Sequence, residues 1–326
     1  MLSRTAESLF WLARYLERAE NNARLVDMGN RMAALPASAE VRAHEWASVV
    51  ISAGVGALYP HLFEKATQTT VARYLLLDPE NPSSVYSCFA QARRNARAVR
   101  TALTSDMWEA INDSWIHVQQ QDMAFLQGGA LADFIDWVRA RGALFRGFVD
   151  SAMQRDEGYD FLRLGTCVER ADSTTRLLDV KYHVLQPEWS GVGGIVDKYQ
   201  WISILRAASS LRGYHRTYDG SVTAWGVVEF LTLNPTSPRS LAFSYECIHH
   251  HLERLKKTYG AEHACNRDVE AILDSLSKET IDTIFAHGLH EFLASFMAKN
   301  NSLSARIGEA YGFGSSAMVS QAGTEA

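Results

Sequence analysis

The sequence of 326 residues has few cysteines, and they are widely spaced. The four are Cys88, Cys167, Cys247 and Cys265, and none of them belongs to a Cys-x-x-Cys motif, the spacing that zinc sites and redox motifs use. A chain of this length buries enough surface to fold without a disulfide or a structural metal. We therefore expect four reduced cysteines, as in cytosolic proteins.

We also expect no leader, and the sequence has no long hydrophobic run. The segment Met1–Glu20 carries charges throughout, which is not typical of a signal peptide. The longest uncharged apolar stretch, Trp46–Pro60, has about fifteen residues and includes serine and glycine, whereas a membrane helix needs about twenty apolar residues. The sequence predicts a cytoplasmic protein without a membrane span.

The chain has no strong excess of charge of one sign. Its 32 Lys and Arg residues and 37 Asp and Glu residues give a formal net charge of −5, so we expect no nucleic-acid partner. It lacks a Walker lysine, a Rossmann glycine pattern and a Gly-x-Ser-x-Gly motif. The glycines at Gly191–Gly194 precede a predicted helix, where they could approach a phosphate, but a connector is the simpler interpretation. No cofactor is expected.

What the chain does have is a helical period. Apolar residues recur from Leu9 to Val26 at the three- and four-residue spacing of one helix face. No segment shows the sustained alternation of a half-buried strand. The sequence predicts an all-α protein, a helical bundle. Further helical runs are expected at about 38–58, 63–77, 82–102, 106–122, 130–154, 158–185, 195–216, 221–232, 238–258, 266–276 and 279–308.

The sequence also repeats itself. Leu9–Asp27 aligns with Phe161–Asp179 at an offset of 152 residues, and both segments contain Glu-Arg-Ala followed by Arg-Leu-x-Asp. Leu75–Ser84 aligns with Leu231–Ser240 at an offset of 156 residues. A nearly constant offset is typical of an internal duplication. We predict two pseudo-repeated halves of about 150 residues, 1–153 and 154–326, each with one Glu-Arg motif and packed as one composite unit.

The second of these alignments contains a loop with two prolines in each copy. Asn81 precedes Pro82, and Ser237 precedes Pro238. Asparagine and serine are favoured at the N-cap, and proline at the first helical position. The pattern predicts that helices begin at Pro82 and Pro238, capped by Asn81 and Ser237.

The repeated pairs Glu17-Arg18 and Glu169-Arg170 are the most informative residues. The polar side of each helix also carries apolar residues, so these helices are expected to bury two faces and the charges between them. A buried charge requires a partner. Adjacent residues on a helix point about 100° apart, so each charge needs a partner on another helix. If the halves pack with pseudo-two-fold symmetry, Glu17 meets Arg170 and Glu169 meets Arg18.

Each motif is followed by a pair of opposite charges within the same helix. Glu20 and Arg24, like Asp172 and Arg176, have the i, i+4 spacing of a helical ion pair. Arg14 differs, because Thr166 stands at the aligned position of the second copy. Any chemistry that uses Arg14 would therefore be asymmetric.

Two interpretations of these charges remain open. In the functional one, the motifs surround a central cleft that binds an anionic substrate and supplies acid-base chemistry. In the structural one, an ion-pair network fixes the register of the helices. The functional interpretation assigns catalysis or amine binding to Glu17 and Glu169, and substrate binding to Arg18, Arg170, Arg14, Arg24 and Arg176.

The ordered set of segments resembles the bacterial alpha-E domain family, a helical domain named for a Glu-Arg motif. The resemblance extends to about residue 255. It is carried by the segments MLSRTAESLFWLARYLERAENNARLVD, LLLDPENPSSVYSCFAQARRNARAVR, DMWEAIN, FLRLGTCVERADSTTRLLDVKYH, YQWISILRAASSLRGYHRTY and EFLTLNPTSPRS.

The resemblance implies a functional context. Such domains are associated with circularly permuted ATP-grasp ligases and transglutaminase-like proteases, and are thought to act in making or modifying peptides. By this analogy we predict a component of an ATP-grasp-associated peptide ligation or modification system. It would bind a peptide or small amine in a cleft lined by the paired Glu-Arg motifs. Because the chain has no phosphate-binding loop, it is not expected to use ATP alone.

Two other functions remain open. In the first, the chain is a non-enzymatic helical scaffold that docks a ligase or protease, and its Glu-Arg pairs are structural. In the second, it is a stand-alone hydrolase that uses the paired carboxylates. The sequence leaves open whether the chain is an enzyme.

Two histidine-containing clusters are further candidates for a metal site. Cys247 and His251 share one helix face at i, i+4, within a run that includes His249–His251. His287, His290 and Glu291 have i, i+3, i+4 spacing, which suits a metal or an acid-base pair. Neither cluster has an obvious further ligand, so no metal site is predicted.

Overall fold

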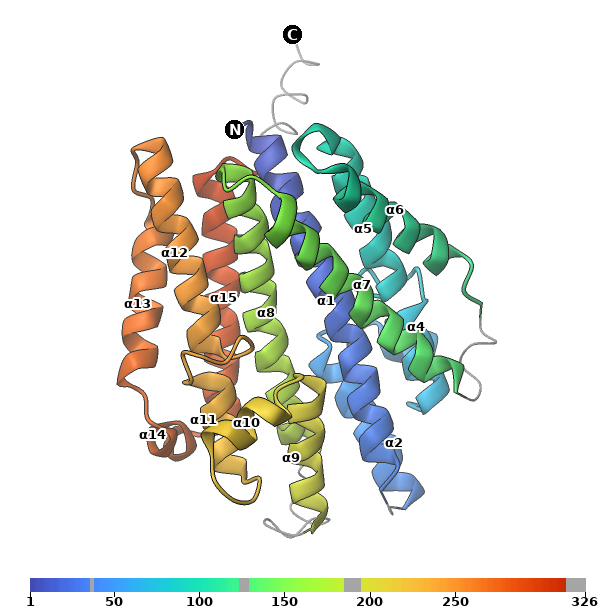
Figure 1. The fold of residues 1–326 in the computed structure, drawn as a ribbon. Coiled ribbons are helices and arrows are strands. Elements are labelled where there is room, and N and C mark those ends of the chain that lie inside the picture. Colours follow the sequence, from blue (N-terminus) through green and yellow to red (C-terminus); the bar gives the residue numbers. More distant parts are fainter. Residues whose placement is uncertain (36–37, 123–128, 185–194, 315–326) are drawn as a thin grey trace.

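The computed structural model describes residues 1–35, 38–122, 129–184 and 195–314. Within these ranges it contains fifteen α-helices, one short 3-10 helix and no strand, which confirms the prediction of an all-α protein (Figure 1). The glycine-rich segment Gly191–Gly194 lies outside the described residues. None of the described helices combines the length and the hydropathy that a membrane span requires.

Most helices lie within the runs that the hydrophobic period predicts. The predicted runs 195–216 and 279–308 are each divided into two helices, and the helix in 38–58 ends at Ser52. The bounds of the helices are α1 Ser3–Ala33, α2 Ala39–Ser52, α3 Tyr59–Leu62, α4 Gln68–Leu76, α5 Val85–Ala98, α6 Ser105–Gln119, α7 Ala130–Ala152, α8 Glu157–Val184, α9 Ile195–Ala207, α10 Leu211–Thr217, α11 Ala224–Thr232, α12 Leu241–Tyr259, α13 Ala264–Lys278, α14 Ile281–His287 and α15 Leu289–Ala310. The 3-10 helix spans Arg100–Ala102.

The long helices α1 and α8 lie against each other at the centre of the bundle (Figure 1). Helices α4, α5 and α7 pack on α1, and α12 and α15 pack on α8. Helix α2 contacts both central helices. Because α1 and α8 have neighbours on several sides, most of their side chains are removed from water, whatever their polarity.

The sequence of α1 explains why it occupies the centre. Leu9, Leu12 and Leu16 are buried on one side, and Phe10 and Leu25 are buried on another. A helix that is apolar on two sides is stable only when it is covered on both. The expectation that this helix buries two faces is therefore confirmed.

A glycine on α8 allows close contact between the central helices. A Cβ atom at Gly165 would lie 2.2 Å from the carbonyl oxygen of Phe10 on α1. Real Cβ atoms do not come so near a backbone atom, so any larger residue would push the two helices apart. The glycine thereby brings the charged side chains of α1 and α8 within reach of one another.

The start of α5 differs from the prediction. The helix begins at Val85, and its N-cap is Ser84, whose hydroxyl accepts a hydrogen bond from the Ser87 backbone N–H at 3.1 Å. Asn81 does not cap it, because its side chain is used in the loop: its amide donates to the Tyr74 carbonyl at 2.9 Å. Pro82 therefore lies in a turn that precedes the helix.

The corresponding prediction for α12 is also wrong. This helix begins at Leu241, and the N-cap is Ser240, whose hydroxyl accepts from the Phe243 backbone N–H at 3.0 Å. Ser237 donates its backbone N–H to the Asn234 side chain at 3.0 Å and so belongs to the loop. In both places the capping serine follows the proline by two positions.

The apolar core is continuous along the molecule. One cluster of buried apolar side chains contains residues from Ala6 to Ile307. The proposed halves 1–153 and 154–326 therefore share this core, and the division between them stays a prediction.

One expectation about the cysteines is wrong. The structure joins Cys167 on α8 to Cys247 on α12 in a disulfide. The two residues are 80 positions apart in the chain, so no local motif marks them, and the packing of α12 along α8 brings them together. Cys88 and Cys265 are buried and lie outside this disulfide.

We predict that Gly165→Ala destabilises the protein by about 1–3 kcal/mol, because the added methyl group overpacks the contact between α1 and α8. Gly147→Ala is the matched control. Gly147 lies within α7, and a Cβ atom there would meet nothing within 4 Å. Alanine should stabilise this exposed helical position by about 0.5–1 kcal/mol. Urea unfolding of the two variants measures both changes in stability. Equal changes for Gly165→Ala and Gly147→Ala would contradict the close contact between α1 and α8.

Candidate functional site

The two Glu-Arg motifs exchange partners between α1 and α8. Arg18 on α1 donates to both carboxylate oxygens of Glu169 on α8, at 2.6 and 3.0 Å. Arg170 on α8 donates to both carboxylate oxygens of Glu17 on α1, at 3.1 Å each. These are the two cross-helix pairs that the repeated sequence predicts. Each is a bidentate pair, a geometry that fixes direction as well as distance.

Glu169 has a second arginine partner on α1. Arg14 donates through Nε to Glu169 at 2.6 Å and through Nη1 to the Ser304 hydroxyl at 2.7 Å. The side chain of Glu169 is only 2% exposed. We call Glu169 together with Arg14 and Arg18 the Glu169 cluster.

Glu17 has two further arginine partners, from outside the central helices. Arg146 on α7 lies 3.2 Å from its carboxylate, and Arg239, just before α12, lies 3.0 Å from it. With Arg170, three guanidinium groups surround one carboxylate. Charges packed this way stabilise the fold only when each is paired, because water is excluded.

The neighbouring carboxylate of Glu20 shares these partners. It accepts from Arg24 at 3.0 Å, from Arg146 at 2.6 Å and from Arg239 at 3.0 Å. Arg24 also donates to the Ala207 carbonyl and so ties α1 to the end of α9. We call the group Glu17, Glu20, Arg24, Arg146, Arg170 and Arg239 the Glu17 cluster.

The i, i+4 pairs form as predicted. Arg24 pairs with Glu20, and Arg176 pairs with Asp172 at 2.6 Å. Arg176 also lies close to Gly54, where a Cβ atom would come within 2.4 Å of its Nη1. Gly54 has a φ of +74°, so the loop after α2 needs glycine both for its conformation and for this contact.

These contacts set the protonation of the glutamates. Burial raises the pKa of Glu17, but the charges of Arg170, Arg239 and Arg146 outweigh burial and hold that pKa far below its usual range. Burial also raises the pKa of Glu169. The charges of Arg18 and Arg14 outweigh burial and lower that pKa to about 2. Both carboxylates are therefore ionised at neutral pH.

The arginine excess also affects one guanidinium. Burial and the neighbouring positive charge of Arg24 lower the pKa of Arg239 to about 9, against the opposing attraction of Glu17 and Glu20. This pKa lies above neutral pH, so Arg239 remains charged. The Glu17 cluster thus holds four arginines against two carboxylates.

All seven predicted site residues lie in or beside these two clusters. Sequence reasoning did not identify Arg146 and Arg239, which complete the Glu17 cluster. Arg239 could have been noticed, because it lies in the repeated loop. There it aligns with Ser83 of the first copy. No comparable repeat marks Arg146, which reaches the cluster because α7 packs on α1.

A cavity of about 160 Å³ opens beside the Glu169 cluster. It lies between α1 and α8 and is bordered by the loop after α2, the loop before α5 and α15. Its lining residues are Arg14, Arg18, Asn21, Asn22, Ala53, Gly54, Ser83, Glu169, Asp172, Arg176 and Asn301. We call it the Glu169 cavity.

The Glu169 cavity has an excess of positive charge. Arg14, Arg18 and Arg176 contribute three positive charges to its lining, and Glu169 and Asp172 contribute two negative ones, which leaves one positive charge. Such a lining can attract an anionic group and hold it with charge-assisted hydrogen bonds.

One buried polar atom in the lining has no partner. Asn21 is 4% exposed, and its Oδ1 accepts no hydrogen bond from any residue that the structure describes. Its neighbour Asn22 donates to the Ser83 carbonyl. A buried acceptor without a donor costs about 1–3 kcal/mol, so a bound group with an N–H would recover that free energy.

The first histidine cluster is used for structure. His251 contacts the carboxylate of Asp160 at 2.7 Å, and Cys247 forms the disulfide. The interpretation of Cys247 and His251 as a pair of metal ligands is therefore wrong. A different set, His249, Glu253 and Glu270, places one ligand atom each within 4.8 Å of the others, but these residues are partly or fully exposed on the surface.

The second histidine cluster is divided by the fold. His290 turns to Asp179 on α8, at 2.7 Å. His287 and Glu291 instead line a cavity of about 330 Å³ between α13, α14 and α15. The three residues therefore do not converge on one point as metal ligands would.

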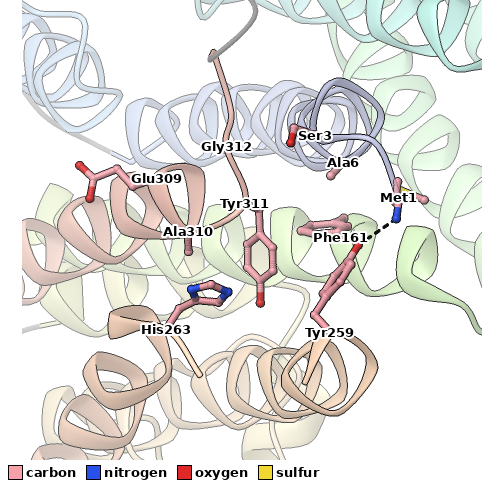
Figure 2. Close-up of a pocket in the computed structure, with 10 residues that line it drawn as sticks. All are labelled: Met1, Ser3, Ala6, Phe161, Tyr259, His263, Glu309, Ala310, Tyr311 and Gly312. Carbon is pink, nitrogen blue, oxygen red and sulfur yellow. Dashed lines mark hydrogen bonds between the residues drawn. The ribbon is translucent and has the colours of Figure 1, made fainter. Parts of the chain in front are cut away.

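A larger cavity, of about 390 Å³, lies at the end of α1 and α8 (Figure 2). Figure 2 shows the ring of Tyr311 between His263 and Tyr259, with Phe161 beside the two tyrosines. The rings of Phe161 and Tyr311 pack edge to face, with 4.9 Å between their centroids. The amino group of Met1 donates to the Tyr259 hydroxyl at 3.2 Å. This cavity contains none of the predicted site residues.

We predict that Glu169→Ala lowers the free energy of unfolding by about 3–5 kcal/mol, because it leaves buried arginines without their carboxylate. In a chain of this length that corresponds to a fall of about 4–7 °C in Tm. Asp136→Ala is the control, because Asp136 pairs with Arg139 but is 75% exposed. The control should change stability by less than about 1 kcal/mol. Equal effects in thermal melts would mean that α1 and α8 do not depend on these ion pairs.

The low pKa of Glu169 predicts a pH dependence. Unfolding returns that carboxylate to a pKa of about 4.3, so on acidification the unfolded state takes up the proton first. The contribution of Glu169 to stability is then present above about pH 4.5 and is lost as the pH falls towards 2. Between about pH 4.5 and 2.5, the unfolding free energy of the wild type should fall more steeply than that of Glu169→Gln, by up to about 1.4 kcal/mol per pH unit.

Urea titrations at a series of pH values measure both slopes. Circular dichroism at neutral pH should show that Glu169→Gln is folded before the comparison is made. Parallel curves for the two proteins would contradict the assignment of a low pKa to Glu169.

Known proteins resemble this chain over most of its length. The model of the Alpha-E family, described as a predicted alpha-helical domain with a conserved ER motif, matches residues 1–311. An uncharacterised protein of Mycobacterium bovis is 24% identical over 314 residues, which cover 90% of this chain and 35% of that protein. Uncharacterised proteins of Mycobacterium tuberculosis match with the same identity and coverage.

The chain thus spans about a third of the length of the curated relatives it matches. No solved structure matches it. The family match extends over almost the whole chain and includes both central helices with their Glu-Arg motifs. The chain therefore belongs to the Alpha-E family of helical domains.

Proposed function

We propose that the chain is the substrate-binding component of a peptide ligation or modification system that works with an ATP-grasp-type ligase and a transglutaminase-like protease. Its substrate is a peptide or small amine, bound in the Glu169 cavity. The observation that carries the proposal is this cavity itself, which combines three arginines, two carboxylates and an unpartnered amide oxygen. Those groups match the charged and N–H-bearing groups of peptides and amines.

The geometry favours binding over proton transfer by the glutamates. A general acid or base works best when its pKa lies near the working pH. Glu17 and Glu169 have lowered pKa values and are each held by two or more arginines. In this proposal they orient the arginines, and Glu169 also offers an acceptor to a bound N–H. Acid-base catalysis by the two carboxylates is the less supported role.

The chemistry of activation is assigned to the partner. A ligase that forms an acyl phosphate needs a bound nucleotide, and this chain has no phosphate-binding motif in its sequence. The mycobacterial relatives are about three times as long as the matched region, which supports a unit that combines with further domains.

The alternative is a non-enzymatic helical scaffold that docks a ligase or protease. The Glu17 cluster favours it, because its charges are almost all buried and paired with one another. Such a network fixes how α1, α7, α8 and α12 meet, and it needs no ligand. In this alternative the outer helices provide the docking surface.

Isothermal titration calorimetry with short peptides and small amines tests the proposal. We expect saturable binding to the wild type. Arg176→Gln should weaken it about 10- to 100-fold, because one charge-assisted hydrogen bond to the ligand is lost. Arg139→Gln is the control, since Arg139 forms a surface pair with Asp136 and does not line the cavity.

Thermal melting of both variants shows whether the fold is retained. Failure of the whole panel to bind the wild type would contradict the proposal and favour the scaffold. Equal affinities of Arg176→Gln and the wild type would show that binding takes place elsewhere.

A further inference from the structure

We propose that the Glu169 cavity takes the carboxyl terminus of a peptide, and that Arg239 fills the corresponding place beside Glu17. The chain would then have one open site and one that its own side chain has closed. This inference rests on the proposed function, and it specifies which end of the substrate is bound and which residue makes the two sides different.

The two sides correspond through the internal alignment. The offset of 152 residues places Glu17 on Glu169 and Arg18 on Arg170. In the structure each glutamate meets the arginine of the other motif, so both sides begin with the same pair. The offset of 156 residues then places Ser83 on Arg239, the residue that precedes the N-cap serine of α5 or α12.

The side of Glu17 is filled. The side chain of Arg239 is 9% exposed and lies 3.0 Å from a carboxylate oxygen of Glu17 and 3.0 Å from one of Glu20. Helix α7 closes the same place tightly, since a Cβ atom at Gly142 would come within 2.5 Å of Glu20 Oε2. The side chain of Arg239 thus occupies this place and leaves no room there for a ligand.

The side of Glu169 is open. Ser83 lines the cavity, and its short side chain leaves a space of about 160 Å³, several times what one water needs. Its backbone carbonyl accepts from Asn22, which holds the loop in place beside α1. In this inference, Ser83 at the position of an arginine leaves this side open, whereas Arg239 and α7 together close the other side.

The lining specifies two groups on one ligand. The excess positive charge from the arginines calls for an anion, and the carboxylate is the group that pairs with guanidinium in a bidentate way. The unpartnered Oδ1 of Asn21 calls for an N–H donor. A peptide carboxyl terminus carries both, because the amide N–H of the last residue lies next to its carboxylate. A simple amine lacks the anion, and a phosphate lacks the N–H.

Three small probes separate these chemistries. N-acetylglycine carries a carboxylate and an amide N–H, acetate has only the carboxylate, and N-methylacetamide has only the amide. We expect N-acetylglycine to bind the wild-type chain at least about tenfold more tightly than either of the other two, measured by calorimetry or by NMR titration. Equal binding of acetate and N-acetylglycine would overturn the role of Asn21 and with it the assignment of a peptide terminus.

The variant Ser83→Arg tests the difference between the sides. The new guanidinium should fill the Glu169 cavity as Arg239 fills the other side, and so weaken N-acetylglycine binding more than about tenfold without lowering Tm. Ser151→Arg, which adds the same charge to the exposed face of α7, is the control and should bind as the wild type does. Unchanged binding to Ser83→Arg would overturn the inference.

Asn21→Leu gives an independent measurement. It removes the acceptor but keeps a similar side-chain size, so it should reduce the affinity for N-acetylglycine to that for acetate and leave acetate binding unchanged. If peptides or amines bind the chain but N-acetylglycine does not, the proposed function holds and the carboxyl-terminus assignment fails. If neither the peptides and amines nor N-acetylglycine bind, both fail.

Discussion

The exchange of partners between two Glu-Arg motifs is the constraint on which the structure depends. Helices α1 and α8 pack so closely that Gly165 touches the backbone of Phe10, and their charged residues are therefore enclosed with them. An enclosed charge without a partner is costly, so Glu17 and Glu169 each require an arginine from the opposite helix. The same requirement explains why side chains from α7 and from the loop before α12 reach the centre of the bundle.

The arginines outnumber the carboxylates on both sides, and this excess links the fold to its proposed function. On the side of Glu17 the excess is absorbed by packing, because Arg239 is shared between two carboxylates and shielded from water. On the side of Glu169 the space remains open and the positive charge faces a cavity. In the proposed function, the network that holds the bundle together would also hold a ligand at one of its edges. The structural and functional interpretations of the motif would then apply to different parts of it.

The proposed division of labour follows from the protonation of the glutamates. Carboxylates whose pKa is lowered by several arginines hold their charge over the whole neutral range. They are suited to fixing guanidinium groups in a binding geometry and poorly suited to moving protons. In the proposed function, such a domain would present a substrate to an activating enzyme, and the partner that carries the nucleotide would supply the chemical step.

The sequence by itself determined the all-α class and the central ion pairs, but not every helix boundary. Spacing along one helix decides which residues share a face, so the buried charges of α1 and α8 could be predicted, and the duplication then indicated that Glu17 meets Arg170 and Glu169 meets Arg18. Only the tertiary structure decided that Arg146 joins them, that Cys167 is bonded to Cys247, and that a cavity remains beside Glu169. These features join residues from helices that are far apart in the chain. Their contacts depend on how the helices pack, and the local spacing of residues along one helix does not predict that packing.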